Sequence, residues 1–354
     1  MSRFLSEKHA ALTPYTPGEQ PRDMVYTKLN TNESPFPPSP AVREAVAREA
    51  ERLNLYNDPT CTALREAAAR LWGVGPENIL PTNGSDEILY FSFLTFCDET
   101  RPAAFPDVTY GFYPVFAELL HVPTHVIPLR EDFSIDPADY IGLHENIVIA
   151  NPNAQTGIAL PAAVIEEIVR SNPDNVVVVD EAYVDFGGES CVPLIKKYDN
   201  LLVTQTFSKS RSLAGARLGF GIGDEALIRD LNTIKYSIHP YNVSRMTQAA
   251  GVAAIADQEY YTANARRIRE TRSYTAGELE ALGFEVLPSR ANFLFARSRD
   301  IPGGELYRSL KARGVLVRWF DSGRIRDFTR ITVGTREQMD TLLDAIRSIL
   351  KERG

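Results

Sequence analysis

Short apolar runs alternate with stretches of helical periodicity along the first two thirds of the chain. The runs that are apolar enough to form buried strands are residues 79–81, 126–128, 147–150, 176–179, 201–203 and 218–222. Between them, residues 86–96, 111–120 and 161–170 carry apolar positions at the spacing of a helix. Continuously apolar strands that alternate with helices are typical of a largely parallel sheet buried between helices. The pattern therefore predicts an α/β fold.

A second unit follows a long helical pattern over residues 245–282. Short strands are predicted at 284–287, 292–296, 315–317 and 331–333, and the chain ends in an amphipathic helix. Thr335 and Gln338 have the spacing of a capping box at the start of that helix. A helix is also predicted over 41–53, after a stiff proline-rich connector at 34–40. We therefore expect an N-terminal arm (1–35), a large domain (36–255) and a smaller α/β C-terminal domain (256–354).

Composition narrows the class of protein. The chain has 354 residues, enough for two domains, and its net charge is 38 − 46 = −8. A negative balance disfavours nucleic acid and anionic membranes as partners. No stretch approaches the roughly 20 apolar residues of a membrane span, and the first residues lack the apolar core of a signal peptide. Cys61, Cys97 and Cys191 are odd in number and far apart, as expected of free thiols in the cytoplasm.

The five histidines give no metal-binding motif. His121 and His125 have the four-residue spacing of two helical ligands, but Pro123 lies between them and disfavours the helix. No metal is therefore expected.

Ligands of open parallel sheets bind beyond the carboxyl ends of the strands, so the polar residues there are the candidates for chemistry. Lys209 follows the strand at 201–203, with Thr206, Ser208 and Arg217 nearby. A lysine amine condenses with an aldehyde, and hydroxyl groups with an arginine suit a dianionic phosphate. Pyridoxal phosphate carries both groups. The alternative for Lys209 is an ordinary surface lysine on a loop.

Two further strand ends carry candidates. Asp180 follows four consecutive valines, where a buried carboxylate needs a partner such as the pyridinium nitrogen of this cofactor; a helix N-cap is the alternative. Gly84, Ser85 and Asp86 begin a helix, either as an anion site or as a simple capped start.

An aromatic residue and two arginines complete the candidates. Tyr110 is an aromatic that could stack on a flat ring or belong to the core. Arg318 and Arg330 lie in or beside apolar strands, where they would clamp anionic substrate groups or form internal salt bridges.

The order of these motifs is characteristic. Residues 84–87 (GSDE), 109–111 (TYG), 151–157 (NPNAQTG), 180–183 (DEAY), 208–217 and 330–335 together resemble fold-type-I pyridoxal-phosphate aminotransferases. Within these, the chain is most similar to the histidinol-phosphate aminotransferases. The similarity also includes residues 12–15, 29–35 and 56–59, and covers nearly the whole chain. It implies a large cofactor-binding domain with a mostly parallel sheet and a smaller C-terminal domain.

The resemblance also implies roles for individual residues. Lys209 would link covalently to pyridoxal phosphate and act as general base, and Tyr110 would stack on the ring. Asp180 would pair with the ring nitrogen and Tyr183 with the ring hydroxyl. The cofactor phosphate would lie among Gly84, Ser85, Asp86, Thr206, Ser208 and Arg217. The substrates would contact Tyr15, Asn32, Arg318 and Arg330, together with Tyr56 from a neighbouring subunit, as expected of a homodimer with shared sites.

One departure from the family pattern falls at the loop 151–157. The family commonly has Asn-Pro-Thr-Gly, whereas this chain has Ala154-Gln155-Thr156-Gly157. The asparagine that usually bonds the ring hydroxyl is therefore displaced to Asn153.

The reaction implied is transamination between L-histidinol phosphate and 2-oxoglutarate, giving imidazole acetol phosphate and glutamate, a step of histidine biosynthesis. Two alternatives keep the fold and cofactor: an aromatic amino acid aminotransferase, and a decarboxylase of a phosphorylated amino acid. A third is a regulatory module that binds pyridoxal phosphate without turnover. Such modules typically carry a basic DNA-binding extension, for which the chain has neither spare length nor positive charge.

Overall fold

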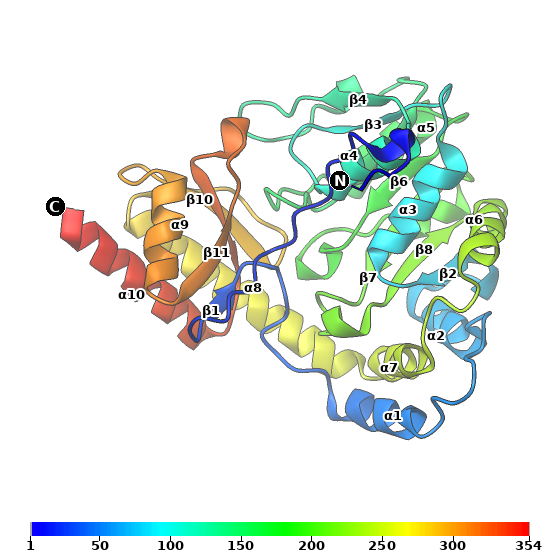
Figure 1. The fold of residues 1–354 in the computed structure, drawn as a ribbon, viewed down its shortest axis with the longest axis horizontal. Coiled ribbons are helices and arrows are strands. Elements are labelled where there is room, and N and C mark those ends of the chain that lie inside the picture. Colours follow the sequence, from blue (N-terminus) through cyan, green and yellow to red (C-terminus); the bar gives the residue numbers. More distant parts are fainter. Residues whose placement is uncertain (1, 354) are drawn as a thin grey trace.

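The computed structural model describes residues 2–353 and contains two sheets (Figure 1). The larger has seven strands in the order β2-β8-β7-β6-β5-β3-β4. Only β8 runs antiparallel to its neighbours, so the sheet is mostly parallel, as predicted. The strands are β2 (Ile79–Thr82), β3 (Ala103–Pro106), β4 (Thr124–Ile127), β5 (Asn146–Ala150), β6 (Val177–Asp180), β7 (Leu201–Thr206) and β8 (Gly219–Gly223).

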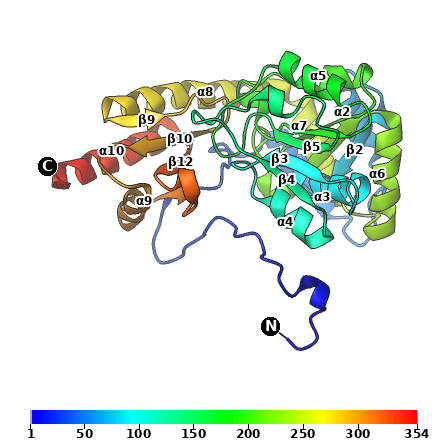
Figure 2. The same cartoon turned by 90° about the horizontal axis from the view of Figure 1, so that it is seen from above.

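Helices cover both faces of this sheet, and the two-residue period of the strands divides the core between them (Figure 2). Val177 and Val179 of β6 pack with α1 (Pro40–Ala50), α2 (Thr62–Trp72), α5 (Ala162–Ser171) and α7 (Arg245–Ala256). Val178, between them, packs on the other face with α3 (Ser85–Phe96), α4 (Phe112–Leu120) and α6 (Glu225–Ile238). Asp180 therefore lies on the α3 face, at the carboxyl end of the strand.

The smaller sheet has the strand order β1-β11-β12-β10-β9. Its strands are β1 (Thr27–Leu29), β9 (Phe284–Val286), β10 (Phe293–Ser298), β11 (Val315–Trp319) and β12 (Phe328–Thr332). Residues of α8 (Gln258–Ala281), α9 (Gly303–Ala312) and α10 (Arg336–Arg353) pack on it. The capping box of α10 is confirmed, because the amide of Thr335 donates to Gln338 Oε1 (2.8 Å) and that of Gln338 donates to Thr335 Oγ1 (3.3 Å).

Three expectations from the sequence are corrected. The helical pattern over 245–282 is two helices, because the backbone of Asp257 (φ −102°, ψ 51°) leaves the helical conformation between α7 and α8. The last strand is β12 at 328–332 rather than 331–333. The predicted arm contributes β1, which pairs in parallel with β11. The predicted boundaries after residues 35 and 255 stay predictions.

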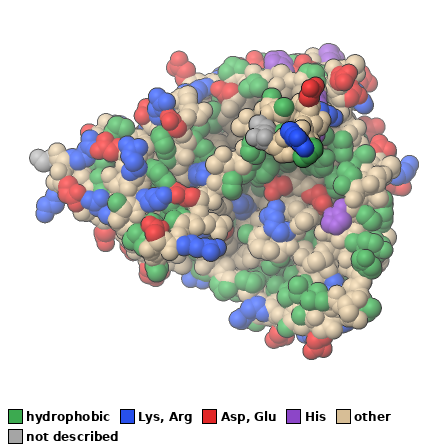
Figure 3. All heavy atoms as spheres, in the orientation of Figure 1, with side chains coloured by type: hydrophobic (Ala, Val, Ile, Leu, Met, Phe, Trp, Pro, Cys, Tyr) green, Lys and Arg blue, Asp and Glu red, His purple; other side chains and the backbone are tan. Residues whose placement is uncertain are grey.

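Between the two sheets, this face of the molecule is hollowed, with acidic and basic side chains in the hollow (Figure 3). Helix α8 connects the part of the chain that carries the larger sheet to the part that carries the smaller one (Figure 1). Within residues 2–353, no helix is long and apolar enough to cross a membrane.

Candidate active site

A cavity of about 220 Å³ lies at the carboxyl ends of β6 and β7. It is lined by residues from segments far apart in the chain. These are Thr31, Glu33, Ser85, Asp86, Tyr110, Ala154, Asp180, Ala182, Tyr183, Thr206, Ser208, Lys209, Ala214 and Arg217. The structure thus brings most of the predicted cofactor-binding residues together in one place.

One end of the cavity is suited to a phosphate group. Helix α3 begins there with no side chain capping its first amides, and Gly84 precedes it at φ 77°. A Cβ atom on Gly84 would lie 2.4 Å from Arg217 Nη2, so only glycine allows this approach. Arg217 Nη2 donates to Asp86 Oδ2 (2.8 Å), and Thr206 Oγ1 lies 2.9 Å from Ser208 Oγ. Free amides, hydroxyls and a guanidinium therefore converge on one point.

The buried carboxylate of Asp180 also lines the cavity and is only 3% exposed. Its Oδ2 accepts from the Tyr113 hydroxyl (2.9 Å), and its Oδ1 from the Ala182 amide (3.2 Å) and Thr204 Oγ1 (3.3 Å). Burial raises the pKa of Asp180 to about 6 in spite of these donors. Within residues 2–353 no cation forms an ion pair with this carboxylate. A buried carboxylate with this environment is suited to a cationic partner.

Tyr113 and Thr204 are the residues that sequence reasoning missed around Asp180. Thr204 lies opposite Asp180 in the register of β6 and β7, so correct strand pairing would have indicated it. Tyr113 comes from α4, and nothing in the local sequence indicates that its hydroxyl reaches β6.

Lys209 and Tyr183 lie side by side on the cavity wall. Lys209 Nζ is 5.8 Å from the centre of the Tyr183 ring and donates to the Thr31 carbonyl oxygen (3.3 Å). The Tyr183 hydroxyl accepts from Asn32 Nδ2 (3.0 Å), which leaves its own proton free to donate. Asn32, predicted to bind substrate, is buried behind Tyr183 and does not line the cavity.

Asn153, predicted to contact the cofactor, does not line the cavity either. Its Oδ1 accepts from the amides of Gln155 (2.9 Å) and Thr156 (3.0 Å), and its Nδ2 donates to the Val108 carbonyl (2.9 Å). The side chain is therefore occupied in shaping its own loop. Ala154 occupies the cavity wall instead and offers no hydrogen bond from its side chain.

Arg330 and Arg318 lie close together, and both guanidinium carbons approach the Phe320 ring, at 5.6 and 5.0 Å. Arg330 Nη1 donates to the Ala154 carbonyl (2.9 Å) and to Gln155 Oε1 (3.3 Å), while its buried Nε has no partner. Burial lowers the pKa of Arg330. Among the described residues neither arginine forms an ion pair, which disfavours the internal salt bridges considered above.

Tyr15 and Tyr56 end in different places. The centre of the Tyr15 ring lies 6.4 Å from that of the Tyr110 ring. Burial raises the pKa of Tyr15, although the positive charges of Arg330 and Arg318 act to lower it. Tyr56 is 80% exposed and stacks on Tyr241 with ring centres 4.6 Å apart. It does not line the cavity of its own chain.

The neighbour of Asp180 gives a test of these electrostatics. Burial raises the pKa of Glu181 to about 7, although Ser190, Gln205 and the Cys191 amide donate to it. The pKa of a glutamate in the unfolded state is about 4.3. Between about pH 5 and 7 the folded state therefore keeps a proton that the unfolded state has already released. Stability from this group therefore rises as the pH falls through 7. On going from pH 7.5 to 5.5, we expect the free energy of unfolding to increase by about 2 kcal/mol less in Glu181→Gln than in the natural chain.

Urea unfolding of the cofactor-free protein at the two pH values measures this difference. The exposed Glu167 provides the matched control, since Glu167→Gln should keep the pH dependence of the natural chain. An unchanged dependence in Glu181→Gln would contradict the raised pKa.

With this geometry established, comparison with known proteins identifies the family. A model of the class I and II aminotransferases matches residues 25–346. The chain belongs to this family. Its class I and II aminotransferase relatives include the histidinol-phosphate aminotransferase of Brachyspira hyodysenteriae, 48% identical over 353 residues, covering 99% of this chain and 100% of that protein. Histidinol-phosphate aminotransferase 1 of Bradyrhizobium diazoefficiens is 50% identical over 350 residues, with coverages of 99% and 100%.

Solved structures of class I and II aminotransferases share the fold. Histidinol-phosphate aminotransferase from Sinorhizobium meliloti, in complex with pyridoxal-5'-phosphate, superposes with a TM-score of 0.83 at 25% identity, covering 91% of each chain. The Clostridium acetobutylicum histidinol-phosphate aminotransferase gives a TM-score of 0.86 at 22% identity, covering 92% of this chain and 99% of that chain. At that identity, the second comparison shows the fold alone.

Proposed function

We propose that this aminotransferase uses pyridoxal phosphate to transfer the amino group of L-histidinol phosphate to 2-oxoglutarate, as a step in histidine biosynthesis. The observation that carries the proposal is the convergence of Lys209, Asp180 and the phosphate-suited end of α3 on one cavity. Relatives about as long as this chain and 48–50% identical to it bear the name of this activity. We place the enzyme in the cytoplasm, where this biosynthesis takes place.

The residues present fit the cofactor. The uncapped start of α3 and Arg217 would hold its phosphate, and Tyr110 would cover its ring, held by a hydrogen bond from its hydroxyl to Asp86 Oδ1 (2.6 Å). When bound, the cofactor supplies an aldehyde that links to amines and a ring that takes up electrons from the donor's α-carbon. Asp180 would keep the ring nitrogen protonated, and the Tyr183 hydroxyl would donate to the ring oxygen.

The amine of Lys209 performs the proton transfer in this proposal. With the cofactor and the donor bound, Lys209 Nζ would act as the general base and hold the proton that leaves the donor's α-carbon. The Thr31 carbonyl oxygen, which accepts from Nζ, keeps the amine oriented at the cavity wall.

The arginines would bind the anionic groups of the two substrates. Arg330 uses Nη1 on its own chain, which leaves Nε and Nη2, the edge that pairs with a carboxylate or phosphate through two hydrogen bonds. Arg318 lies beside it, anchored to the carbonyls of Thr16 and Pro17 (2.9 and 3.1 Å). This supports the proposal of a bidentate anion site next to the cavity.

The experiment that tests the proposal is a single half-reaction. The protein loaded with pyridoxal phosphate is mixed with either histidinol phosphate or phenylalanine, and the absorbance of the Lys209-linked cofactor is followed as it converts to the amine form. Rapid conversion with histidinol phosphate and slow conversion with phenylalanine is the expected result. The reverse preference would make the protein an aromatic amino acid aminotransferase. Release of carbon dioxide from a phosphorylated amino acid, supplied in a separate reaction, would make it a decarboxylase.

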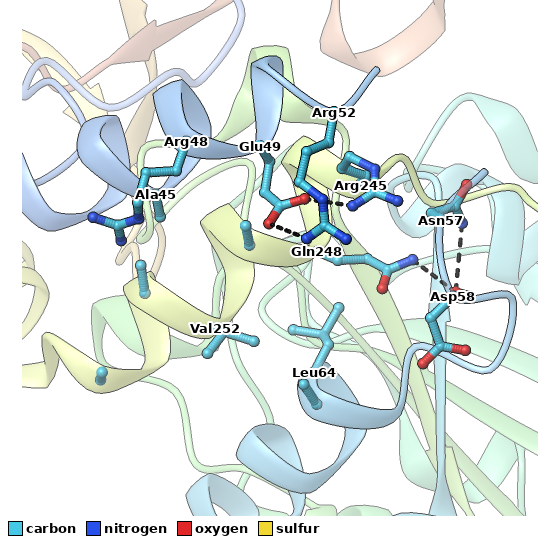
Figure 4. Close-up of a pocket in the computed structure, with 14 residues that line it drawn as sticks. Ala45, Arg48, Glu49, Arg52, Asn57, Asp58, Leu64, Arg245, Gln248 and Val252 are labelled. Carbon is cyan, nitrogen blue, oxygen red and sulfur yellow. Dashed lines mark hydrogen bonds and ion pairs between the residues drawn. The ribbon is translucent and has the colours of Figure 1, made fainter. Parts of the chain in front are cut away.

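We also propose that the enzyme is a homodimer in which Tyr56 completes the partner's site. Hydrogen bonds hold the loop at 56–59 against α6 and α7, while the Tyr56 side chain is exposed. Three of its carbonyl oxygens accept hydrogen bonds from α6 and α7: Tyr56 from Arg245 (2.8 Å), Asp58 from Gln248 (2.9 Å), and Pro59 from Lys235 (2.5 Å). Figure 4 shows the bond between Gln248 and Asp58. Arg245 is itself held by Glu49 (2.7 Å). Exposed apolar side chains surround the loop: Leu53, Leu55, Tyr236, Ile238 and Tyr241. A rigid, exposed aromatic within an apolar patch is typical of an interface.

Mixing of inactive variants tests the shared site. Subunits with Lys209→Ala and subunits with Tyr56→Ala are each expected to be strongly impaired. After subunit exchange, half of the dimers are mixed. Each mixed dimer has one intact site, which combines Lys209 of one subunit with Tyr56 of the other. The mixture should therefore recover about a quarter of the normal activity.

The control is a mixture of Lys209→Ala with Asp180→Ala subunits. Both residues belong to the same site of one chain, so no recovery is expected. If the first mixture also stays inactive, Tyr56 does not act across the subunits.

A further inference from the structure

Two polar cavities of about 380 and 230 Å³ lie behind the loop that carries Lys209. They adjoin, because Asp185, Arg211, Gln258 and Arg269 line both. Thr206 lines the larger one and also the active-site cavity, so one strand end separates the two regions. None of the roles proposed above uses these cavities.

Arg211 is the unusual residue of this region. It is only 6% exposed, and within residues 2–353 it forms no ion pair. Nη2 donates to Gln258 Oε1 (3.0 Å) and Nη1 to the Ala254 carbonyl (3.4 Å), but the buried Nε has no partner. Burial lowers the pKa of Arg211. The rings of Phe207 and Tyr261 lie 5.4 Å from the guanidinium carbon and partly compensate its burial, but they leave its N–H donors without an acidic partner. Such an environment is suited to an anion.

Arg269 provides a second cation on the same wall. It is half-buried, and in the described part of the chain its side chain makes neither a hydrogen bond nor an ion pair. Asp185 is the acidic residue that lines the cavities, but it is exposed to solvent, and its carboxylate already accepts from Ser210. The charged residues of the lining, two arginines and one aspartate, therefore leave a net charge of +1.

The neutral side chains of the larger cavity do not offset this charge. The Ser190 hydroxyl and Gln205 Nε2 donate to the buried Glu181 (2.7 and 2.8 Å). In the smaller cavity the Tyr261 hydroxyl accepts from the Ser39 amide (3.2 Å), which leaves its proton, like the guanidinium groups, available to an anion.

We infer that a small tetrahedral oxyanion, of the phosphate or sulfate class, binds between Arg211 and Arg269. Guanidinium groups bind such anions through paired, charge-assisted hydrogen bonds, and both residues have donors free. The site is distinct from the cofactor phosphate site at α3, and it does not depend on the identity of the amino donor.

Binding there would connect two parts of the fold. Arg211 is two residues from Lys209 in the chain, whereas Arg269 lies on α8, which leads to the smaller sheet. An anion that contacts both would fasten the lysine loop to this helix and stabilise the folded enzyme. Free anions would thereby act on the protein without entering the active site.

Selenate serves as a probe of this site because it mimics sulfate and gives an anomalous X-ray signal. In crystals of the enzyme with pyridoxal phosphate bound, we expect a selenate peak between Arg211 and Arg269 that is absent in Arg211→Met. Any selenate beside Arg330 should be unaffected by this change. Crystals of the natural chain with no peak between the two arginines would overturn the inference.

Thermal unfolding of the same holoenzyme tests the inference in solution. Sulfate at about ten times its Kd should raise the Tm of the natural chain by about 2 °C more than it raises that of Arg211→Met. Acetate at equal ionic strength should not reproduce the difference. Equal shifts in the two proteins, or an equal effect of acetate, would contradict a tetrahedral oxyanion site. If Arg211→Met does not fold, Arg269→Met provides the same comparison.

Discussion

Replacing Lys209 with alanine is expected to lower the turnover number by about 10³-fold or more. The variant loses the general base that moves the proton, and no other lysine lines the cavity. The cofactor should still bind, because α3, Arg217 and Tyr110 are untouched. Steady-state kinetics measures the loss, and fluorescence titration with pyridoxal phosphate measures the binding that remains.

The surface residue Lys196 gives the matched control for this substitution. Lys196→Ala removes an exposed amine with no hydrogen bond in the described structure, so turnover should be unchanged. Full activity in Lys209→Ala would refute the assignment of Lys209 as the general base. If the variant neither folds nor binds the cofactor, the loop that carries Lys209 has a structural role instead.

Replacing Asp180 with alanine is expected to slow the reaction by two decades or more. The carboxylate is the buried partner available for a protonated ring nitrogen, and leaving a buried cation unpaired costs about 3–5 kcal/mol. If about 2.7 kcal/mol of this falls on the transition state, the rate drops about 100-fold. Asp180→Asn should be almost as slow, because it keeps the shape and the hydrogen bond from Tyr113 but not the charge.

Comparing the two Asp180 variants separates charge from packing. If Asp180→Asn were as active as the natural chain, catalysis would need the shape and hydrogen bonds of this side chain but not its negative charge. Glu181→Gln is the control for a neutralised buried carboxylate, since Glu181 does not line the active-site cavity and should retain turnover. Near-normal turnover in Asp180→Ala would exclude the pairing with the ring nitrogen.

That most of the candidate cofactor-binding residues line one cavity could be predicted because these residues follow the strand ends. Asp180 and Lys209 both come after continuously apolar runs, so local sequence was sufficient to place them at one edge of a parallel sheet. The helix start at Gly84 was also predicted, whereas the close approach of Arg217 to this glycine is visible only in the structure.

What the sequence did not indicate depends on contacts between distant segments. Asn32 lies behind Tyr183, 151 positions along the chain, and Asn153 is occupied within its own loop. Side-chain hydrogen bonds of this kind have no periodic signature. Helix ends were also uncertain, because the break at Asp257 rests on two backbone angles rather than on a glycine or proline.

Strand β1 has a consequence for the order in which the protein is assembled. Residues 27–29 leave the ribosome early, yet their partner strand, β11, lies almost three hundred positions later. The edge of the smaller sheet therefore stays incomplete until β11 has been made. The larger sheet consists entirely of residues 79–223, so it can form first. We expect β1 to stay unpaired until β11 has been synthesised. Chains that stop before residue 315 should therefore keep residues 27–29 accessible to proteases.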